Sequence, residues 1–88
     1  MRATSRLAAL TERHLRRRFH DAVGYGHKTL QRVLRLRRFL ALAESEAGPD
    51  LARVAAEAGY ADQPHLTREC AELAGLPPAA LLASRAAA

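Results

Sequence analysis

A short segment of this sequence occurs twice, 51 residues apart, and this duplication constrains the fold more than any other feature. Four residue types return in the same order and at the same spacing: His14, Leu15, Arg17 and Gly24 in the first copy, and His65, Leu66, Arg68 and Gly75 in the second. The duplication predicts two similar helical units, each closed by a glycine. In a small, strongly basic protein, two such units suggest two similar reading heads, and duplex DNA is the natural repetitive target.

The composition favours helices and argues against an enzyme. The chain has 88 residues, which is room for one small domain or for two minimal helical units that share a core. Alanine, leucine and arginine dominate, tryptophan is absent and few residues are β-branched, so we expect an all-α chain. The sequence has no glycine-rich phosphate loop, no nucleophile with a matching base and no paired carboxylates, and we therefore expect no enzyme.

The cysteine, histidine and apolar residues predict neither a metal site nor a membrane segment. One cysteine cannot form an internal disulfide, and four scattered histidines lack the spacing of metal ligands, so we expect no metal and no cofactor. No apolar run approaches the roughly 18 residues of a membrane span, and none follows a basic region as in a signal peptide. We therefore expect a cytoplasmic protein without a membrane partner.

Positive charge is concentrated in the first half of the chain. Residues 1–40 hold 11 lysines and arginines against two acids, a net charge of +9, whereas residues 41–88 hold three arginines against seven acids, a net charge of −4. Neutralising phosphates releases counterions, and this term dominates non-specific affinity for nucleic acid. A polyanion would therefore be held mainly by the first half, although the charge by itself is equally compatible with a solvated surface.

The first half predicts an amphipathic helix followed by a long buried one. Thr11 is suited to cap a helix over residues 11–23, which glycines then end. A helical wheel places the apolar side chains of this helix on one side and a cationic set on the other. The cationic set is Arg13, Arg16, Arg17 and His20. A second helix over 27–44 carries apolar residues on more than one side, so we expect it to lie between neighbours, and its length of roughly 25 Å would separate two units.

The second half predicts two helices around a glycine turn, and then a closing helix. Asp50 is a good N-cap for residues 51–58, and Gly59 begins a tight turn into a helix that starts near Asp62. Its apolar side would carry Leu66, Cys70 and Leu73, and its outer side Pro64, Thr67, Arg68 and Ala71. A proline pair then opens a last short helix over residues 79–85.

The second half also carries the motif of a known family. The motif consists of a helix of small residues over 51–58, a Gly-aromatic turn, Asp-Gln-x-His, an arginine on the next helix, and Gly-x-x-Pro after it. In this chain these are Gly59-Tyr60, Asp62-Gln63-Pro64-His65, Arg68 and Gly75-Leu76-Pro77-Pro78. The pattern resembles the second helix-turn-helix of AraC-type transcriptional regulators. Residues 11–24 look like the recognition helix of the first helix-turn-helix of that family, and residues 35–39 resemble its linker helix.

The resemblance, which covers about residues 10–82, implies a homeodomain-like arrangement of two helix-turn-helix units joined by a linker helix. The units would divide the chain into residues 1–26 with a recognition helix at about 11–23, a linker helix at 27–46, and a second unit with its closing helix at 47–85. The family domain has an additional helix and a turn glycine ahead of the first recognition helix, which residues 3–10 do not supply. We therefore expect the first unit to be incomplete.

The resemblance also implies which residues contact double-stranded DNA. Two recognition helices would enter successive major-groove segments, which lie about 34 Å apart on one face of the duplex. The base-facing candidates are Arg13, Arg16 and Arg17 in the first unit and Gln63, Thr67 and Arg68 in the second. The candidates for phosphate contacts, which position without specifying, are Arg18, Lys28 and Arg32. Phosphate contacts and salt bridges between helices are equally open for Arg35, Arg37 and Arg38.

Two other functions fit the sequence. The cationic first half would by itself support a helical protein that binds polyanions or membranes without specificity. The acidic second half and the incomplete first unit would suit a truncated domain that acts as a protein-interaction module, with RNA polymerase or a full-length relative as its partner. Members of the family usually carry a sensing or dimerisation domain, which would be missing here. We expect His14, His65 and Cys70 to serve packing or capping rather than ligand binding.

Overall fold

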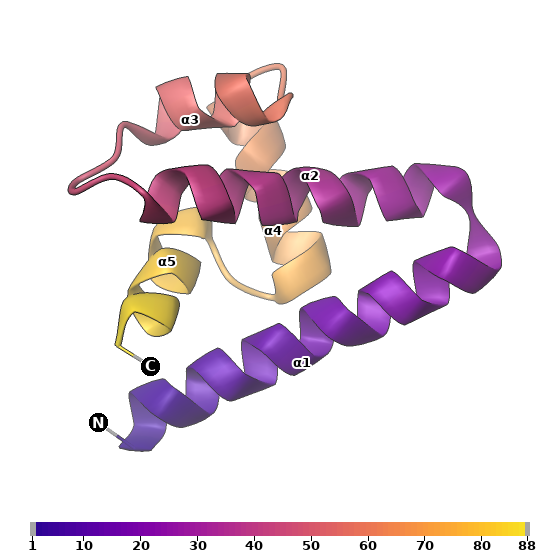
Figure 1. Ribbon diagram of the computed structural model, residues 1–88, viewed down its shortest axis with the longest axis horizontal. Coiled ribbons are helices and arrows are strands. Elements are labelled where there is room, and N and C mark those ends of the chain that lie inside the picture. Colours follow the sequence, from indigo (N-terminus) through magenta and orange to yellow (C-terminus); the bar gives the residue numbers. More distant parts are fainter. Residues whose placement is uncertain (1, 88) are drawn as a thin grey trace.

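The computed structural model describes residues 2–87, with the side chains of residues 9–21 and 26–87. Five helices follow one another along the chain: α1 (Arg2–Tyr25), α2 (His27–Glu44), α3 (Leu51–Ala58), α4 (Gln63–Ala74) and α5 (Pro78–Ala86). No strand occurs within these residues, which confirms the prediction of an all-α chain. In Figure 1, α1 and α2 run back along each other, α3 packs on α2, and α5 returns towards the first half of α1.

The first helix is longer than the sequence predicted. α1 begins at Arg2 and runs unbroken to Tyr25, so Thr11 lies in its interior with a buried side chain, and the prediction that Thr11 caps this helix is wrong. The residues ahead of Thr11 include no glycine or proline and are rich in alanine, leucine and arginine, so nothing stops the helix there. The first unit is incomplete, as expected, because no turn divides α1 into two helices.

The next two helices have the predicted bounds. α2 spans the expected residues 27–44 and is buried on more than one side. The carboxylate of Asp50 caps α3 by accepting a hydrogen bond of 3.1 Å from the backbone N–H of Ala52. Gly59 ends α3 with a φ of 105°, a left-handed conformation that glycine adopts without strain. The helix, the glycine turn and α4 together form one complete helix-turn-helix.

The helix after this turn begins where the cap signal placed it. The carboxylate of Asp62 accepts a hydrogen bond of 2.8 Å from the backbone N–H of His65, and Pro64 lies in the first turn, where a helix needs no donor. α4 ends at Gly75, which has a φ of 76°. The closing helix α5 starts at Pro78, one residue before the predicted start.

A single core joins the five helices. Its fully buried side chains come from every helix and include Leu15 of α1, Leu36 and Phe39 of α2, Val54 of α3, Leu66 and Cys70 of α4, and Leu81 of α5. The duplicated leucines, Leu15 and Leu66, are both completely buried, whereas the duplicated arginines, Arg17 and Arg68, are both exposed. The two copies of the repeated segment therefore turn the same face towards the same core.

Cys70 belongs to this core, as predicted. Its side chain is completely buried, and burial raises the pKa of the thiol to about 12. The thiol is therefore protonated at neutral pH and packs as a small apolar group.

Candidate nucleic-acid interface

The first candidate surface is the outer face of α1. Its arginines are all exposed, and none forms an ion pair with a residue that the structure describes: Arg13, Arg16, Arg17 and Arg18. Leu15 is completely buried on the other side of the helix, which fixes the rotation of α1 and turns these guanidinium groups outward. We refer to these four arginines as the α1 face.

A shallow hollow of about 200 Å³ lies on the α1 face, between Leu10, Arg13, His14 and Arg17. The exposure of Leu10 was not expected, because the sequence placed this residue ahead of the helix rather than within it. Burial, followed by repulsion from Arg18 and Arg17, lowers the pKa of His14 below its ordinary value. The imidazole is therefore neutral at neutral pH, and the charge of this face comes from arginine alone.

The second candidate surface is the outer face of α4. Four exposed side chains line a hollow of about 460 Å³ on this helix: Gln63, Pro64, Thr67 and Arg68. The structure thus brings together the three residues expected to face bases in the second unit, with Pro64 beside them. The hydroxyl of Thr67 donates a hydrogen bond of 3.0 Å to the backbone oxygen of Gln63, so its lone pairs and its methyl group face outward. We refer to these four residues as the α4 face.

His65 supports the start of α4 rather than adding to the α4 face. Its Nδ1 accepts a hydrogen bond of 3.2 Å from the backbone N–H of Ala61, and its ring meets the ring of Tyr60 edge-on at 5.0 Å between centroids. The expected capping and packing role of His65 is therefore what the structure has.

The arginines of α2 divide into paired and unpaired groups. Arg32, expected to contact phosphate, donates from Nε to Glu69 at 3.0 Å and also pairs with Glu72, so its charge is committed to α4. Arg35 likewise pairs with Glu69, and Arg37 pairs with Glu12 of α1 at 3.1 Å. These three arginines act as salt bridges between helices and are not free to bind phosphate.

The same sorting extends over the rest of the described chain. Arg53 pairs with Glu46 and Glu57 around α3, and Arg85 of α5 pairs with Glu12 and Glu44. Among the residues whose side chains are described, the cations outside any ion pair are Arg13, Arg16, Arg17, Arg18, Lys28, Arg38 and Arg68. Free positive charge is therefore found on the two faces and on the exposed side of α2.

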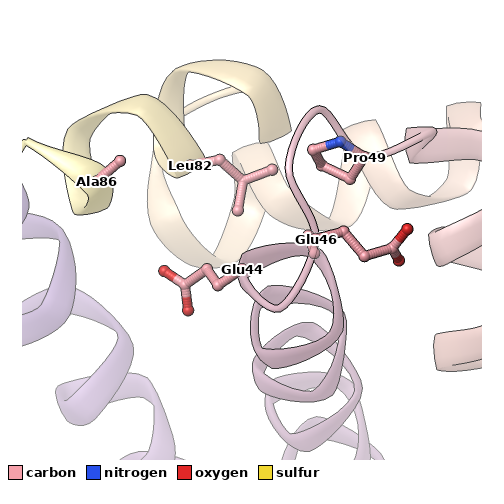
Figure 2. A pocket seen from close by; sticks show the side chains of 6 residues that line it. Glu44, Glu46, Pro49, Leu82 and Ala86 are labelled. Atoms are coloured by element: carbon pink, nitrogen blue, oxygen red, sulfur yellow. The ribbon is translucent and has the colours of Figure 1, made fainter.

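A third hollow shares no residue with the two faces. It measures about 320 Å³ and is lined by Ala43, Glu44, Glu46, Pro49, Leu82 and Ala86. Figure 2 shows the carboxylates of Glu44 and Glu46 pointing in opposite directions, away from Leu82. Each is held by an arginine, Arg85 or Arg53. Carboxylates on both flanks repel phosphate, so this hollow does not extend the candidate interface.

Two further features concern other kinds of site. Within the described residues, no three histidine, cysteine or acidic side chains are close enough to hold a metal ion. None of the helices there combines the length and the apolar character that a membrane span requires.

Comparison with known families agrees with this geometry. A family model described as a helix-turn-helix domain, of the AraC type, matches residues 4–84. The chain belongs to the AraC-type helix-turn-helix family. Membership of this family indicates DNA binding in transcription regulation. No curated protein and no solved structure matches the chain significantly.

Proposed function

We propose that this chain binds double-stranded DNA sequence-specifically, with the α1 face and the α4 face in successive segments of the major groove. The observation that carries the proposal is the sorting of the arginines. Those outside the two faces are mostly neutralised by carboxylates, whereas Arg17 and Arg68, at the same place in the two repeats, are both exposed and unpaired. Free guanidinium groups on one surface favour phosphate and base contacts over a merely solvated surface.

The residue types of the α4 face suit base reading. The guanidinium of Arg68 can pair with O6 and N7 of guanine, and the amide of Gln63 can pair with N6 and N7 of adenine. The outward methyl group of Thr67 can contact the methyl group of thymine. This combination supports recognition of a mixed sequence rather than of charge alone.

The α1 face would contribute most of the electrostatic affinity. Arg13, Arg16 and Arg17 are the proposed base contacts of this face, and guanine is the base that arginine pairs with best. Arg18 and Lys28 are exposed and unpaired, so we assign them to phosphates, and Arg38 joins them on the same grounds. Such a role implies a protein that works in the cytoplasm.

Affinity for two duplexes tests this assignment. One duplex is enriched from a random pool by the purified chain near physiological salt, and the other has the same composition in scrambled order. Arg17→Ala should weaken binding to the enriched duplex by about 1–3 kcal/mol and relax base preference. Lys28→Ala should weaken binding to both duplexes about equally, because a phosphate contact carries no sequence information.

Arg53→Ala is the matched control, because it removes the same charge from a guanidinium already paired with Glu46 and Glu57. It should change neither affinity. If Arg17→Ala weakened both duplexes equally, the base-reading role of the α1 face would be wrong. If the unmodified chain bound both duplexes alike, it would be a non-specific polyanion binder, and if it bound neither, a protein-interaction module with a partner such as RNA polymerase.

A further inference from the structure

Glu69 is a buried carboxylate on the recognition helix α4, on the side opposite to the bases. It follows Arg68 directly, yet only 4% of its side chain is exposed, against 62% for Glu72 one turn later. Its partners are two arginines of α2. Arg35 donates to it from Nε at 3.0 Å and from Nη2 at 2.7 Å, and Arg32 donates from Nε at 3.0 Å. Three charge-assisted hydrogen bonds therefore converge on one carboxylate.

The carboxylate stays ionised in this place. Burial by itself raises the pKa of a carboxyl group, but the hydrogen bonds from Arg35 and Arg32 outweigh burial and hold the pKa of Glu69 below its ordinary value. A two-pronged arginine–carboxylate contact has a fixed geometry, because both N–H groups must point at the two oxygens in one plane. The contact consequently resists rotation of α4 about its axis more than apolar packing alone would.

The same arginine also touches the turn that leads into α4. The guanidinium of Arg35 lies over the ring of Tyr60, 5.1 Å from its centroid, and Tyr60 packs against His65 in the first turn of α4. One side chain of the linker helix thus contacts both the glycine turn and the middle of the recognition helix. Because Glu69 and Thr67 lie about 200° apart around the helix, fixing Glu69 inward directs the α4 face outward.

We propose that Glu69 is a positioning residue for DNA reading, which sets the rotation of α4 through Arg35 and at the same time neutralises Arg35 and Arg32. The proposal rests on the proposed DNA-binding function. It has two separate consequences. The fork holds the α4 face in register with the bases, and the neutralised arginines do not offer α2 as an additional non-specific contact for phosphate.

The first copy of the repeat lacks this arrangement. The residue 51 positions before Glu69 is Arg18, which is exposed and unpaired, so α1 has no buried carboxylate at this place. α1 is tied instead through Glu12, whose carboxylate accepts hydrogen bonds from Arg37 at 3.1 Å and from Arg85 at 2.5 Å. Positioning by Glu69 is therefore a property of the second unit.

The test measures Glu69→Gln against the enriched and the scrambled duplex over a range of salt concentrations. Loss of register should lower the ratio of the two affinities by roughly tenfold, the equivalent of one charge-assisted hydrogen bond. Release of Arg32 and Arg35 should leave affinity for the scrambled duplex unchanged or raise it. Its salt dependence should become steeper by about 0.9 for each phosphate gained. Glu72→Gln, the same change at an exposed site of the same helix, should leave the ratio unchanged.

Arg35→Lys separates positioning from charge and from folding. Lysine keeps the positive charge on α2 but has no planar fork, so the affinity ratio should fall while affinity for the scrambled duplex stays the same. Far-ultraviolet circular dichroism establishes that each variant retains the helices of the wild-type chain. A variant that lost affinity for both duplexes in proportion would show that Glu69 supports stability only, and would overturn the proposal.

The wild-type measurement distinguishes the two levels of the argument. If the unmodified chain does not discriminate between the duplexes, the proposed function fails and the role of Glu69 falls with it. If the unmodified chain discriminates and both Glu69→Gln and Arg35→Lys do so equally well, only the role of Glu69 is overturned.

Discussion

α1 and α4 bury the same residues of the repeat but differ in how they begin. α4 starts at Gln63, directly after the Asp62 cap, so the residues of the α4 face lie at the N-terminal end of a helix. α1 starts at Arg2, and the α1 face therefore lies along the middle of a helix. The N-terminal end of a helix attracts phosphate through its free N–H groups and its dipole, whereas the middle of a helix does not.

This difference suggests why the two faces have different compositions. The α1 face has no helix end beside it and carries four arginines, while the α4 face has a helix end and carries a single arginine with Gln63 and Thr67. A face without backbone donors must obtain its affinity from side chains. We therefore expect the α1 face to supply charge and the α4 face to supply a larger share of base discrimination.

The largest expected effects test whether the two repeats contribute equally to the core. Leu15→Ala and Leu66→Ala should each lower the free energy of unfolding by about 2–5 kcal/mol, because both side chains are completely buried and leave a cavity. Leu34→Ala is the control, because Leu34 is 48% exposed, and it should cost about 0.5 kcal/mol or less. Urea denaturation measures all three. A loss at Leu15 as small as that at Leu34 would show that α1 is not part of the shared core.

The next effects separate charge from reading. Arg16→Ala on the α1 face should weaken binding by about 1–3 kcal/mol. If Arg16 also neutralises phosphate, the slope of log affinity against log salt should fall by about 0.9. Gln63→Ala on the α4 face should weaken binding to the enriched duplex by about 1–3 kcal/mol without changing that slope. Fluorescence anisotropy at several salt concentrations measures both. Equal slopes for the two variants would remove the distinction between the faces.

Glycine substitutions test the unbroken course of α1. Gly75→Ala should destabilise the chain by about 1–2 kcal/mol, because Gly75 has a φ of 76° that alanine disfavours. Ala9→Gly should cost about 0.5–1 kcal/mol, because glycine is unfavourable inside a helix. Thermal unfolding measures both variants. A neutral or stabilising Ala9→Gly would mean that a turn, rather than a helix, precedes the α1 face.

The smallest expected effect concerns the pH dependence of the α1 face. The lowered pKa of His14 means that the folded chain binds a proton less readily than the unfolded chain. Its contribution to stability is therefore complete above the ordinary pKa of 6.5 and declines as the pH falls below 6.5 towards the folded pKa. His14→Gln should remove this decline in denaturation experiments between about pH 7 and pH 5. An NMR titration that gave His14 an ordinary or raised pKa would contradict this expectation.

Sequence reasoning found those parts of the fold that depend on local signals. Asp50 and Asp62 were recognised as caps, and Gly59 and Gly75 as helix ends, because a cap or a left-handed glycine acts within one turn of the helix it bounds. The same reasoning failed at Thr11, whose side chain and neighbours look like a cap. Whether a helix starts there depends on whether the preceding residues also form one, and these residues continue the helix.

The candidate site was only partly predictable for a different reason. The outward direction of Arg17 and Arg68 follows from the buried leucines two positions before them, which is a local relation. The pairing of Arg32 with Glu69, by contrast, joins residues of two different helices, and no helical period relates them. Arg32 and Arg38 look alike in the sequence, but only the fold brings carboxylates to the first and none of the described ones to the second.

The most direct test of the account is selection of bound duplexes from a random pool with the purified 88-residue chain near physiological salt. Two enriched blocks whose centres lie about one helical turn, or 10 base pairs, apart would show that both faces read DNA together. A single enriched block would contradict the account by showing that only one of the two helices reads bases. The absence of any enrichment would show that the free arginines bind phosphate without specificity or serve another partner.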